Sequence, residues 1–309
     1  MRASFIRTLV EVANDDPRIM LLTGDLGFMA IEPFSQTFPD RFLNIGVAEQ
    51  NMVGVASGLA EAGYIPFCYS IAPFAVLRPY EFIRNGPVHH RLPVRIVGVG
   101  GGFEYGPAGP SHHAIEDIAV MRALPGMTVV APADAAQTVN ALRATWDLPG
   151  PIYYRIGKDD HTVIPGLDGR FSLGRAEILR QGEDILIITT GSVAVEAVAA
   201  ADLLDAEGVA VGLMTVASIE PAPRDDLTEA MAEVRAVVTL EAHVLGGGLG
   251  ALVAEIIAER GLRCRLRRVA ISRGACPQSG SMSYMHQVHG LTANQVVETT
   301  KLLLASVCP

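Results

Sequence analysis

The chain has 309 residues, half of them hydrophobic, and its 33 acidic residues against 24 Lys and Arg give a formal charge of −9. This length allows two α/β domains that each bury a core. The acidic balance and the lack of a Lys/Arg run argue against a nucleic-acid partner, and the apolar runs are too short to span a membrane.

Residues 1–19, MRASFIRTLVEVANDDPRI, have the spacing of an amphipathic helix and become polar by Asn14. We therefore expect no signal peptide. The cysteines lack paired, metal-type spacing, so we predict no metal ligands, reduced thiols and a cytoplasmic location; they are Cys68, Cys264, Cys276 and Cys308.

Short apolar runs alternate with helical patterns through the first half. We expect strands at 18–24, 64–70, 94–100, 127–132 and 151–157, and helices at 47–62, 114–123 and 134–147. This alternation predicts a parallel sheet with helices on both faces, which is a three-layer α/β domain.

A second alternating pattern follows a Gly-, Asp- and Pro-rich segment at 158–182. Its expected strands are 184–191, 209–216, 235–241 and 263–271, and its helices are 192–207, 224–234, 247–260 and 292–305. We predict two α/β domains with parallel sheets, at residues 1–165 and 183–309, joined by a linker at 166–182.

Glu49 stands in the middle of an apolar stretch, NIGVAEQNMVG (44–54), where a strand should give way to a helix. A carboxylate in such a place must meet water, find a partner or take up a proton. The alternative to a functional role is an acid in the first helical turn, which the helix dipole favours.

Three further segments carry candidate residues near strand ends, where parallel sheets place ligands. Residues 70–85 combine Phe74 with two arginines, although core and solvent positions are the commoner explanation for such residues. The Gly/Pro-rich loop 100–117 ends in two histidines, suited to donating a proton near neutral pH or to a helix-cap region. Arg155 follows a strand and suits a carboxylate or phosphate.

Five segments in order resemble the transketolase family, namely its pyrimidine-binding and C-terminal domains. They are FLNIGVAEQNMVGVASGLAEAG (42–63), GPSHHAIEDIAVMRALPGMTVVAPAD (109–134), IYYRIGK (152–158), DILIITTGS (184–192) and VTLEAHVLGGGLG (238–250). The resemblance runs from about residue 4 to 305 and is specific for the superfamily, but less so for the substrate.

The resemblance implies a thiamine diphosphate site. Glu49 would meet N1′ of the aminopyrimidine ring and share a proton with it, which activates the cofactor. Phe74 aligns with the aromatic residue that stacks on this ring, and Ile71 replaces a second aromatic. Asp25 takes a position that approaches the cofactor across a subunit interface, with an exposed loop acid as the alternative.

The family motif for the diphosphate and Mg²⁺ is missing. No Gly-Asp-Gly occurs in the 309 residues, and TGDLG (23–27) is the nearest string. We therefore expect a split enzyme in which a separate N-terminal transketolase-like subunit carries the diphosphate-binding domain, with two copies of each chain (α2β2). The C-terminal domain, with its glycine-rich turn at 241–250, would be structural.

The resemblance assigns substrate contacts to several residues. His112 is retained as a catalytic histidine, and Arg78 and Arg155 are expected to approach a phosphate or another anionic group. His113 stands where many relatives carry Gln, and it would contact substrate or cap the next helix.

The substrate itself is less defined than the fold. A histidine and an acid that contact the sugar donor in ordinary transketolases are replaced by Gly100 and Ala108. A buried sugar hydroxyl without a partner costs about 1–3 kcal/mol. We expect transfer of a two-carbon ketol unit, or of an acyl unit from a decarboxylated 2-keto acid, to an aldehyde.

Two other functions remain open at this level. The β-subunit of a 2-keto acid dehydrogenase shares the two-domain plan and also needs a partner, although GVAEQNM and GPSHH favour the transketolase branch. A non-catalytic scaffold subunit is the third hypothesis, and the joint retention of Glu49, Phe74 and His112 argues against it.

Overall fold

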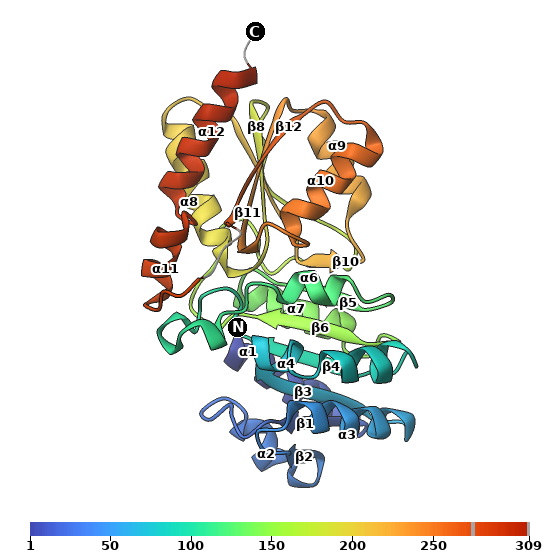
Figure 1. Ribbon diagram of the computed structural model, residues 1–309. Coiled ribbons are helices and arrows are strands. Elements are labelled where there is room, and N and C mark those ends of the chain that lie inside the picture. The colour runs from blue at the N-terminus through green and yellow to red at the C-terminus, as the bar shows by residue number, and fades with distance from the viewer. Residues whose placement is uncertain (273–275, 308–309) are drawn as a thin grey trace.

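The computed structural model of the chain describes residues 1–272 and 276–307. It contains two sheets with helices on both faces of each, one in each half of the chain (Figure 1). The α/β fold with two mainly parallel sheets, predicted from the alternating sequence pattern, is confirmed.

The first sheet has seven strands in the order β10-β5-β6-β4-β3-β1-β2. All its pairings are parallel except that of β10 with β5. The elements of this half are α1 (Arg2–Asp15), β1 (Ile19–Thr23), α2 (Glu32–Thr37), η1 (Pro39–Arg41), β2 (Phe42–Asn44), α3 (Glu49–Glu61), β3 (Ile65–Ile71), α4 (Ala72–Val76), α5 (Tyr80–Ile83), η2 (Arg84–Val88), β4 (Arg95–Val99), η3 (Gly106–Ala108), η4 (Pro110–His112), α6 (Asp117–Arg122), β5 (Thr128–Val130), α7 (Ala135–Thr145) and β6 (Ile152–Ile156).

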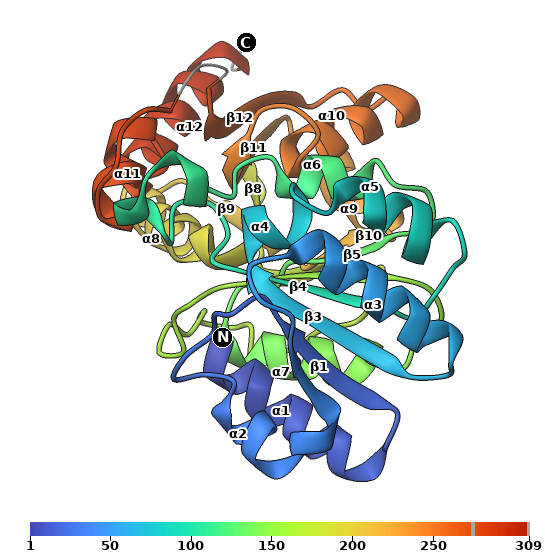
Figure 2. The same ribbon diagram turned by 60° about the horizontal axis from the view of Figure 1, so that its bottom comes forward.

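Helices cover both faces of this sheet, and its central strands carry mostly apolar residues. Every residue of β1, β4 and β6 is buried, as expected for parallel strands between two helical layers. Helices α3 to α6 pack on one face, and α1, α2 and α7 pack on the other (Figure 2). The first layer carries the candidate site residues.

The second sheet has five strands in the order β12-β11-β8-β9-β7, and only β7 runs antiparallel to its neighbour. Helices α8, α11 and α12 lie on one side and α9 and α10 on the other (Figure 1). The elements of the second half of the chain, among which β10 belongs to the first sheet, are β7 (Glu177–Arg180), β8 (Ile185–Thr189), η5 (Gly191–Val193), α8 (Ala194–Ala206), β9 (Val211–Thr215), β10 (Ser218–Glu220), α9 (Arg224–Ala232), β11 (Ala236–Val244), α10 (Leu249–Arg260), β12 (Arg265–Ile271), α11 (Met282–His289) and α12 (Ala293–Val307).

Two short strands differ from the sequence-based expectation. Strand β7 lies inside the segment expected to be a linker, 166–182, so part of that segment belongs to the second sheet. Strand β10 comes from the second half of the sequence but pairs with β5 in the first sheet. Both strands are antiparallel edge strands of three or four residues, too short to show a period in the sequence.

The two halves share one apolar core. Ile118 and Met121 of α6 belong to the same buried cluster as Leu249 and Leu252 of α10. Arg122 adds a salt bridge to Glu255 of α10. Helix α6 of the first layer is therefore covered by the second half of the chain.

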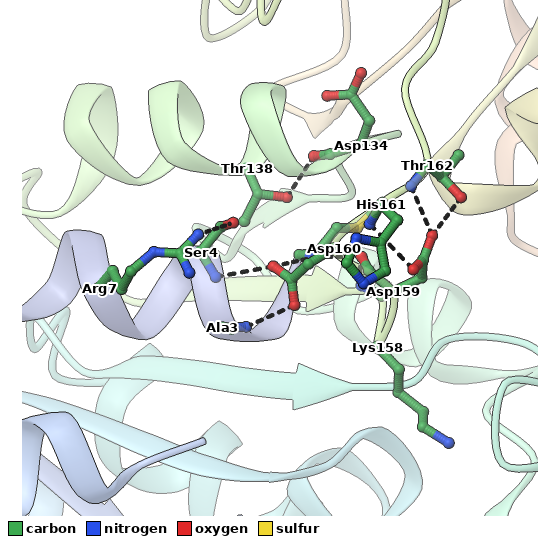
Figure 3. Close-up of polar contacts among 12 residues, drawn as sticks. Ala3, Ser4, Arg7, Asp134, Thr138, Lys158, Asp159, Asp160, His161 and Thr162 are labelled. Carbon is green, nitrogen blue, oxygen red and sulfur yellow. Dashed lines mark hydrogen bonds and ion pairs between the residues drawn. The ribbon is translucent and has the colours of Figure 1, made fainter. Parts of the chain in front are cut away.

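The segment after β6 fixes the start of α1 (Figure 3). The carboxylate of Asp160 accepts hydrogen bonds from the backbone N–H groups of Ala3 (3.0 Å) and Ser4 (2.9 Å), two of the first amides of that helix. Asp134 caps α7 in the same region by accepting from the N–H of Gln137 at 2.8 Å. Both helices thereby obtain a defined start. Within residues 1–272 and 276–307, no helix is both long and apolar enough to cross a membrane.

Candidate active site

The site is built at the carboxyl ends of the central strands. Helix α3 begins at Glu49, a few residues after β2, and packs against β3 and β1. The side chain of Glu49 is only 1% exposed. Gly24, which follows β1, passes so close that a Cβ there would lie 3.3 Å from Oε1 of Glu49. The carboxylate is thus enclosed by the strand ends, as the parallel topology requires.

Two side chains bind the Glu49 carboxylate. The hydroxyl of Ser70, near the end of β3, donates to Oε1 at 3.2 Å, and Nη1 of Arg78 donates to Oε2 at 2.9 Å. Ser70 is fully buried, but the Arg78 side chain is 39% exposed. The carboxylate is therefore paired, and the arginine lies on its open side.

Aromatic rings extend the site from Arg78 toward the loop 100–117. The guanidinium carbon of Arg78 lies 3.9 Å from the centre of the Phe74 ring. The Phe74 ring meets the His112 ring edge-to-face, with 4.9 Å between centroids. Glu49, Arg78, Phe74 and His112 therefore form one continuous group, although they come from three segments of the sequence.

Tyr105 and Lys158 continue this group beyond His112. The Tyr105 ring lies 6.3 Å from His112, and Nζ of Lys158 lies 4.2 Å from the centre of the Tyr105 ring. Nδ1 of His112 is 3.0 Å from the Ser111 hydroxyl. A cation and two hydrogen-bonding rings thus follow Phe74 in this chain of contacts, which starts at Glu49.

Ile71 and Asp25 flank the carboxylate without binding it in the structure. Ile71 is half-buried, ends β3 and serves as the N-cap residue of α4. Asp25 is exposed at φ 58° and forms a mutual pair with Asn44: its N–H donates to Oδ1 at 3.0 Å, and Nδ2 of Asn44 donates back at 2.9 Å. Asp25 therefore lies at the same sheet edge, directly after Gly24.

His113 points away from the Phe74 group. It is 3% exposed, packs edge-to-face on Phe103 with centroids 5.0 Å apart, and has Nδ1 3.8 Å from Sγ of Cys276. Burial lowers the pKa of His113. The N-cap residue of α6 is Glu116, so the expected capping role is also absent. Its position supports a packing role against the second half of the chain.

Arg155 differs most from its expected role. Its guanidinium is buried; Nε donates to Oδ2 of Asp117 at 2.7 Å, and Nη2 donates to the carbonyls of Ala114 (3.0 Å) and Ala242 (2.9 Å). The hydroxyl of Tyr153 donates to the same carboxylate oxygen at 2.6 Å. The structure therefore gives Arg155 a structural role between the two halves in place of the expected contact with an anionic substrate.

The loop 100–117 is mostly packed between the two halves. Gly101, Gly102 and Phe103 are buried, and a Cβ on Gly102 would be 2.7 Å from that of Ala242. Gly100 has φ 81°, and a Cβ there would be 2.3 Å from the Tyr105 ring. The side chain of Tyr105 thus fills the space next to Gly100, and only the part of this loop around His112 joins the Phe74 group.

Sequence patterns missed Ser70, Tyr105 and Lys158 as members of the site. Ser70 had a usable signal, because it is a small polar residue in an otherwise apolar strand. The position of Tyr105 depends on a positive φ at Gly100, which a single sequence does not reveal. Among the described residues, no group of three or more His, Cys, Asp or Glu side chains is arranged to hold a metal ion.

In the glycine-rich turn 241–250 before α10, a carboxylate of the chain itself binds the first amides of the helix. The carboxylate of Glu241 accepts from the N–H groups of Leu249 (2.7 Å) and Gly250 (2.8 Å) at the start of this helix. A Cβ on Gly248 would lie 2.1 Å from Oε2 of Glu241. This carboxylate takes the place that a phosphate would need, which supports the expected structural role of the turn.

Comparison with known proteins agrees with this geometry. Residues 1–162 match the family described as transketolase, pyrimidine binding domain, and residues 174–296 match transketolase, C-terminal domain. The chain belongs to the transketolase family. The resemblance predicted from the sequence is confirmed.

Three members of the transketolase family illustrate the similarity. The 6-deoxy-6-sulfo-D-fructose transketolase subunit of Clostridium sp. (strain MSTE9) is 35% identical over 96% of this chain and 92% of its own length. An apulose-4-phosphate transketolase subunit of Actinobacillus succinogenes is 32% identical over 94% of each chain. A solved structure described as a split gene transketolase, inactive beta4 tetramer, has a TM-score of 0.87 at 37% identity and covers 98% of this chain and 97% of its own. These relatives are themselves subunits or split-gene chains.

Proposed function

We propose that this chain is the cofactor-activating subunit of a two-polypeptide transketolase. The enzyme would move a two-carbon ketol unit from a ketose donor to an aldehyde. The observation that carries the proposal is the Glu49 carboxylate, which is buried at the carboxyl ends of β1 and β3 and is linked through Arg78 to the ring of Phe74. A buried carboxylate at a strand end, shielded from water, can share a proton with a bound ring nitrogen.

The residues around Glu49 fit the aminopyrimidine of thiamine diphosphate. An acceptor oxygen, the half-buried ring of Phe74 and the half-buried side chain of Ile71 offer one polar edge and two apolar surfaces. When bound, thiamine diphosphate supplies a thiazolium carbon that adds to the donor carbonyl and stores the two-carbon unit. Asp25, next in the chain to Gly24, would approach the cofactor at the subunit interface.

Each residue of this chain then has a defined task. Glu49 holds a proton at N1′ of the ring, and Phe74 fixes the ring plane by stacking. His112 would bind or protonate a substrate oxygen through Nε2, because Nδ1 is engaged with Ser111. Lys158, 4.2 Å above the Tyr105 ring, is the cation we assign to an anionic end of the substrate in place of Arg155.

The diphosphate and Mg²⁺ would be held by a second polypeptide. No Gly-Asp-Gly occurs in this chain, and the relatives are described as subunits or as a split-gene product. An α2β2 assembly would place the cofactor between this chain and an N-terminal transketolase-like subunit. Chains without that partner would lack half of the cofactor site.

The donor is proposed to be a ketose that carries an anionic group. The relatives are named for a sulfonated fructose and for apulose 4-phosphate, which both have such a group. Tyr105 occupies the space beside Gly100, and Ala108 is exposed, so the donor contacts differ from those of ordinary transketolases. Steady-state assays of the reconstituted pair should compare xylulose 5-phosphate, 6-deoxy-6-sulfo-D-fructose and pyruvate as donors. Turnover of either ketose would support ketol transfer, and turnover of pyruvate alone would contradict it in favour of acyl transfer.

Two alternatives are tested by the same reconstituted pair. Transfer of an acyl group to a lipoyl domain would identify a 2-keto acid dehydrogenase β-subunit. Full activity of the pair after Glu49→Gln would indicate a scaffold subunit that takes no part in the chemistry.

A further inference from the structure

The pair between Arg78 and Glu49 has a consequence for cofactor binding. We propose that Arg78 is a placeholder for the aminopyrimidine ring: in the isolated chain it occupies two of the ring's contacts, Glu49 and Phe74, and it is displaced when the cofactor binds. This inference rests on the proposed function, because it takes Glu49 and Phe74 as the contacts of the ring.

The first shared contact is the carboxylate edge. Nη1 of Arg78 donates to Oε2 of Glu49 at 2.9 Å, while Oε1 faces the Ser70 hydroxyl at 3.2 Å. A ring nitrogen that shares a proton with Glu49 needs an oxygen on the open side of the carboxylate. The arginine binds that oxygen, and it lies on the open side, since its side chain is 39% exposed whereas that of Glu49 is 1% exposed.

The second shared contact is the face of an aromatic ring. The guanidinium is planar, and its central carbon lies 3.9 Å from the centre of Phe74. An aminopyrimidine stacked on Phe74 with its edge at Glu49 would need the same volume. A planar cation with N–H donors on its edge thus makes both of these contacts, and the two groups exclude each other.

Arg78 is placed where it can leave without disrupting a helix. It lies in the turn 77–79, between the end of α4 at Val76 and the start of α5 at Tyr80. Its side chain makes no hydrogen bond to the described residues other than the one to Glu49. Breaking this pair and the stack on Phe74 therefore frees the guanidinium.

The pair stabilises the isolated chain and weakens cofactor binding. An unpaired carboxylate at the position of Glu49 would be costly to bury, and Arg78 removes that cost before the cofactor arrives. The apparent affinity for the cofactor falls by the fraction of chains in which Arg78 has moved away. If one chain in ten is open, the apparent Kd is about tenfold above the intrinsic value.

Calorimetric titration of thiamine diphosphate with Mg²⁺ into the complex with the diphosphate-binding subunit tests the placeholder. Arg78→Ala and Arg78→Gln should each lower the apparent Kd by about tenfold. Arg84→Ala is the matched control, because Arg84 is exposed on the next turn and hydrogen-bonds only Asn85 among the described residues. It should leave the Kd unchanged. An unchanged or higher Kd for both Arg78 variants would overturn the proposal.

The donor KM of Arg78→Gln and the activity of Glu49→Gln distinguish the placeholder role from other roles. If Arg78 served only the substrate, Arg78→Gln would raise the donor KM without lowering the cofactor Kd, and this outcome also overturns the placeholder. Glu49→Gln tests the proposed function separately: its activity should be lost whatever Arg78 does. Loss of activity in Glu49→Gln together with an unchanged cofactor Kd in both Arg78 variants would contradict the placeholder role of Arg78 and would still support the proposed function.

Discussion

The carboxylate of Glu49 is the residue-scale feature on which the proposed chemistry depends. Glu49→Gln should lower kcat of the reconstituted enzyme by about 100-fold or more, since a neutral amide cannot share a proton with a ring nitrogen as a carboxyl group does. Glu61→Gln, at the exposed end of the same helix, is the control and should retain normal kcat. Steady-state assays measure kcat of both variants, and equal kcat values would contradict a role for Glu49 in activating the cofactor.

Arg155 offers a second residue-scale prediction. Arg155→Met leaves Asp117 buried without its charged partner and should lower the free energy of unfolding by about 3–5 kcal/mol. Asp117→Asn in the same chain should restore part of the loss, because it removes the unpaired charge. Urea unfolding followed by circular dichroism measures both effects. A raised donor KM with unchanged stability would instead support the original substrate-binding assignment.

At this scale the sequence predicted which residues lie near strand ends better than it predicted where their side chains point. Glu49, Phe74, Arg78 and His112 meet in one group, as a search at strand ends suggested. His113 is adjacent in sequence to His112 but turns toward the opposite side, because the chain leaves η4 in an extended conformation at that residue. The direction of a loop side chain depends on such dihedral angles, which residue type alone does not determine.

At the scale of elements, helix starts are fixed by buried carboxylates. Glu241→Gln removes one of the two acceptor oxygens that bind the first amides of α10, in a fully buried position. We expect a loss of about 1–3 kcal/mol of unfolding free energy. Glu259→Gln, near the exposed end of α10, should change stability by less than about 0.5 kcal/mol. Chemical denaturation of the two variants measures the difference, and equal stability would show that the cap contributes nothing.

Asp160 makes the start of α1 sensitive to acid. Burial raises its pKa, but hydrogen bonds from the terminal ammonium and from the amides of Ser4 and Ala3 outweigh this, so its pKa lies well below the usual range (Figure 3). A lowered pKa in the folded state adds stability above about pH 4, the usual value for an unfolded Asp, and this stability is lost as the pH falls further.

The test of this cap is a stability profile against pH. Asp160→Asn should be less stable than the parent at pH 7, and the difference should shrink below about pH 4. Asp168→Asn, at an exposed turn position, is the control, and its free energy of unfolding should follow the pH dependence of the parent. A difference in unfolding free energy between Asp160→Asn and the parent that stays constant down to about pH 2 would contradict a stabilising role for the ionised Asp160 carboxylate.

Long buried elements were predictable and short edge elements were not. Strands such as β4 and β6 are mostly apolar and are buried along their whole length, which is typical of a parallel sheet covered on both faces. Strands β2, β7 and β10 have three or four residues each, and their pairing depends on the neighbour that the fold supplies. Local periodicity contains no information about that neighbour.

At the scale of the whole molecule, the two halves should unfold as one unit. Strand β10 crosses into the first sheet, and helices α6 and α10 share a buried core. Trp146, the single tryptophan, reports on the first half alone, whereas far-UV circular dichroism reports on both. Urea transitions followed by the two signals should coincide. An earlier tryptophan transition would show that the halves unfold separately.

The most direct test of the split-site proposal is calorimetric titration of thiamine diphosphate with Mg²⁺. The cofactor should be titrated into this chain alone and into the chain combined with its diphosphate-binding subunit. Because this chain supplies Glu49 and Phe74 but no Gly-Asp-Gly motif, we predict tight binding only in the mixture. Equally tight binding by the chain alone, or no binding in either sample, would contradict a cofactor site shared between two polypeptides.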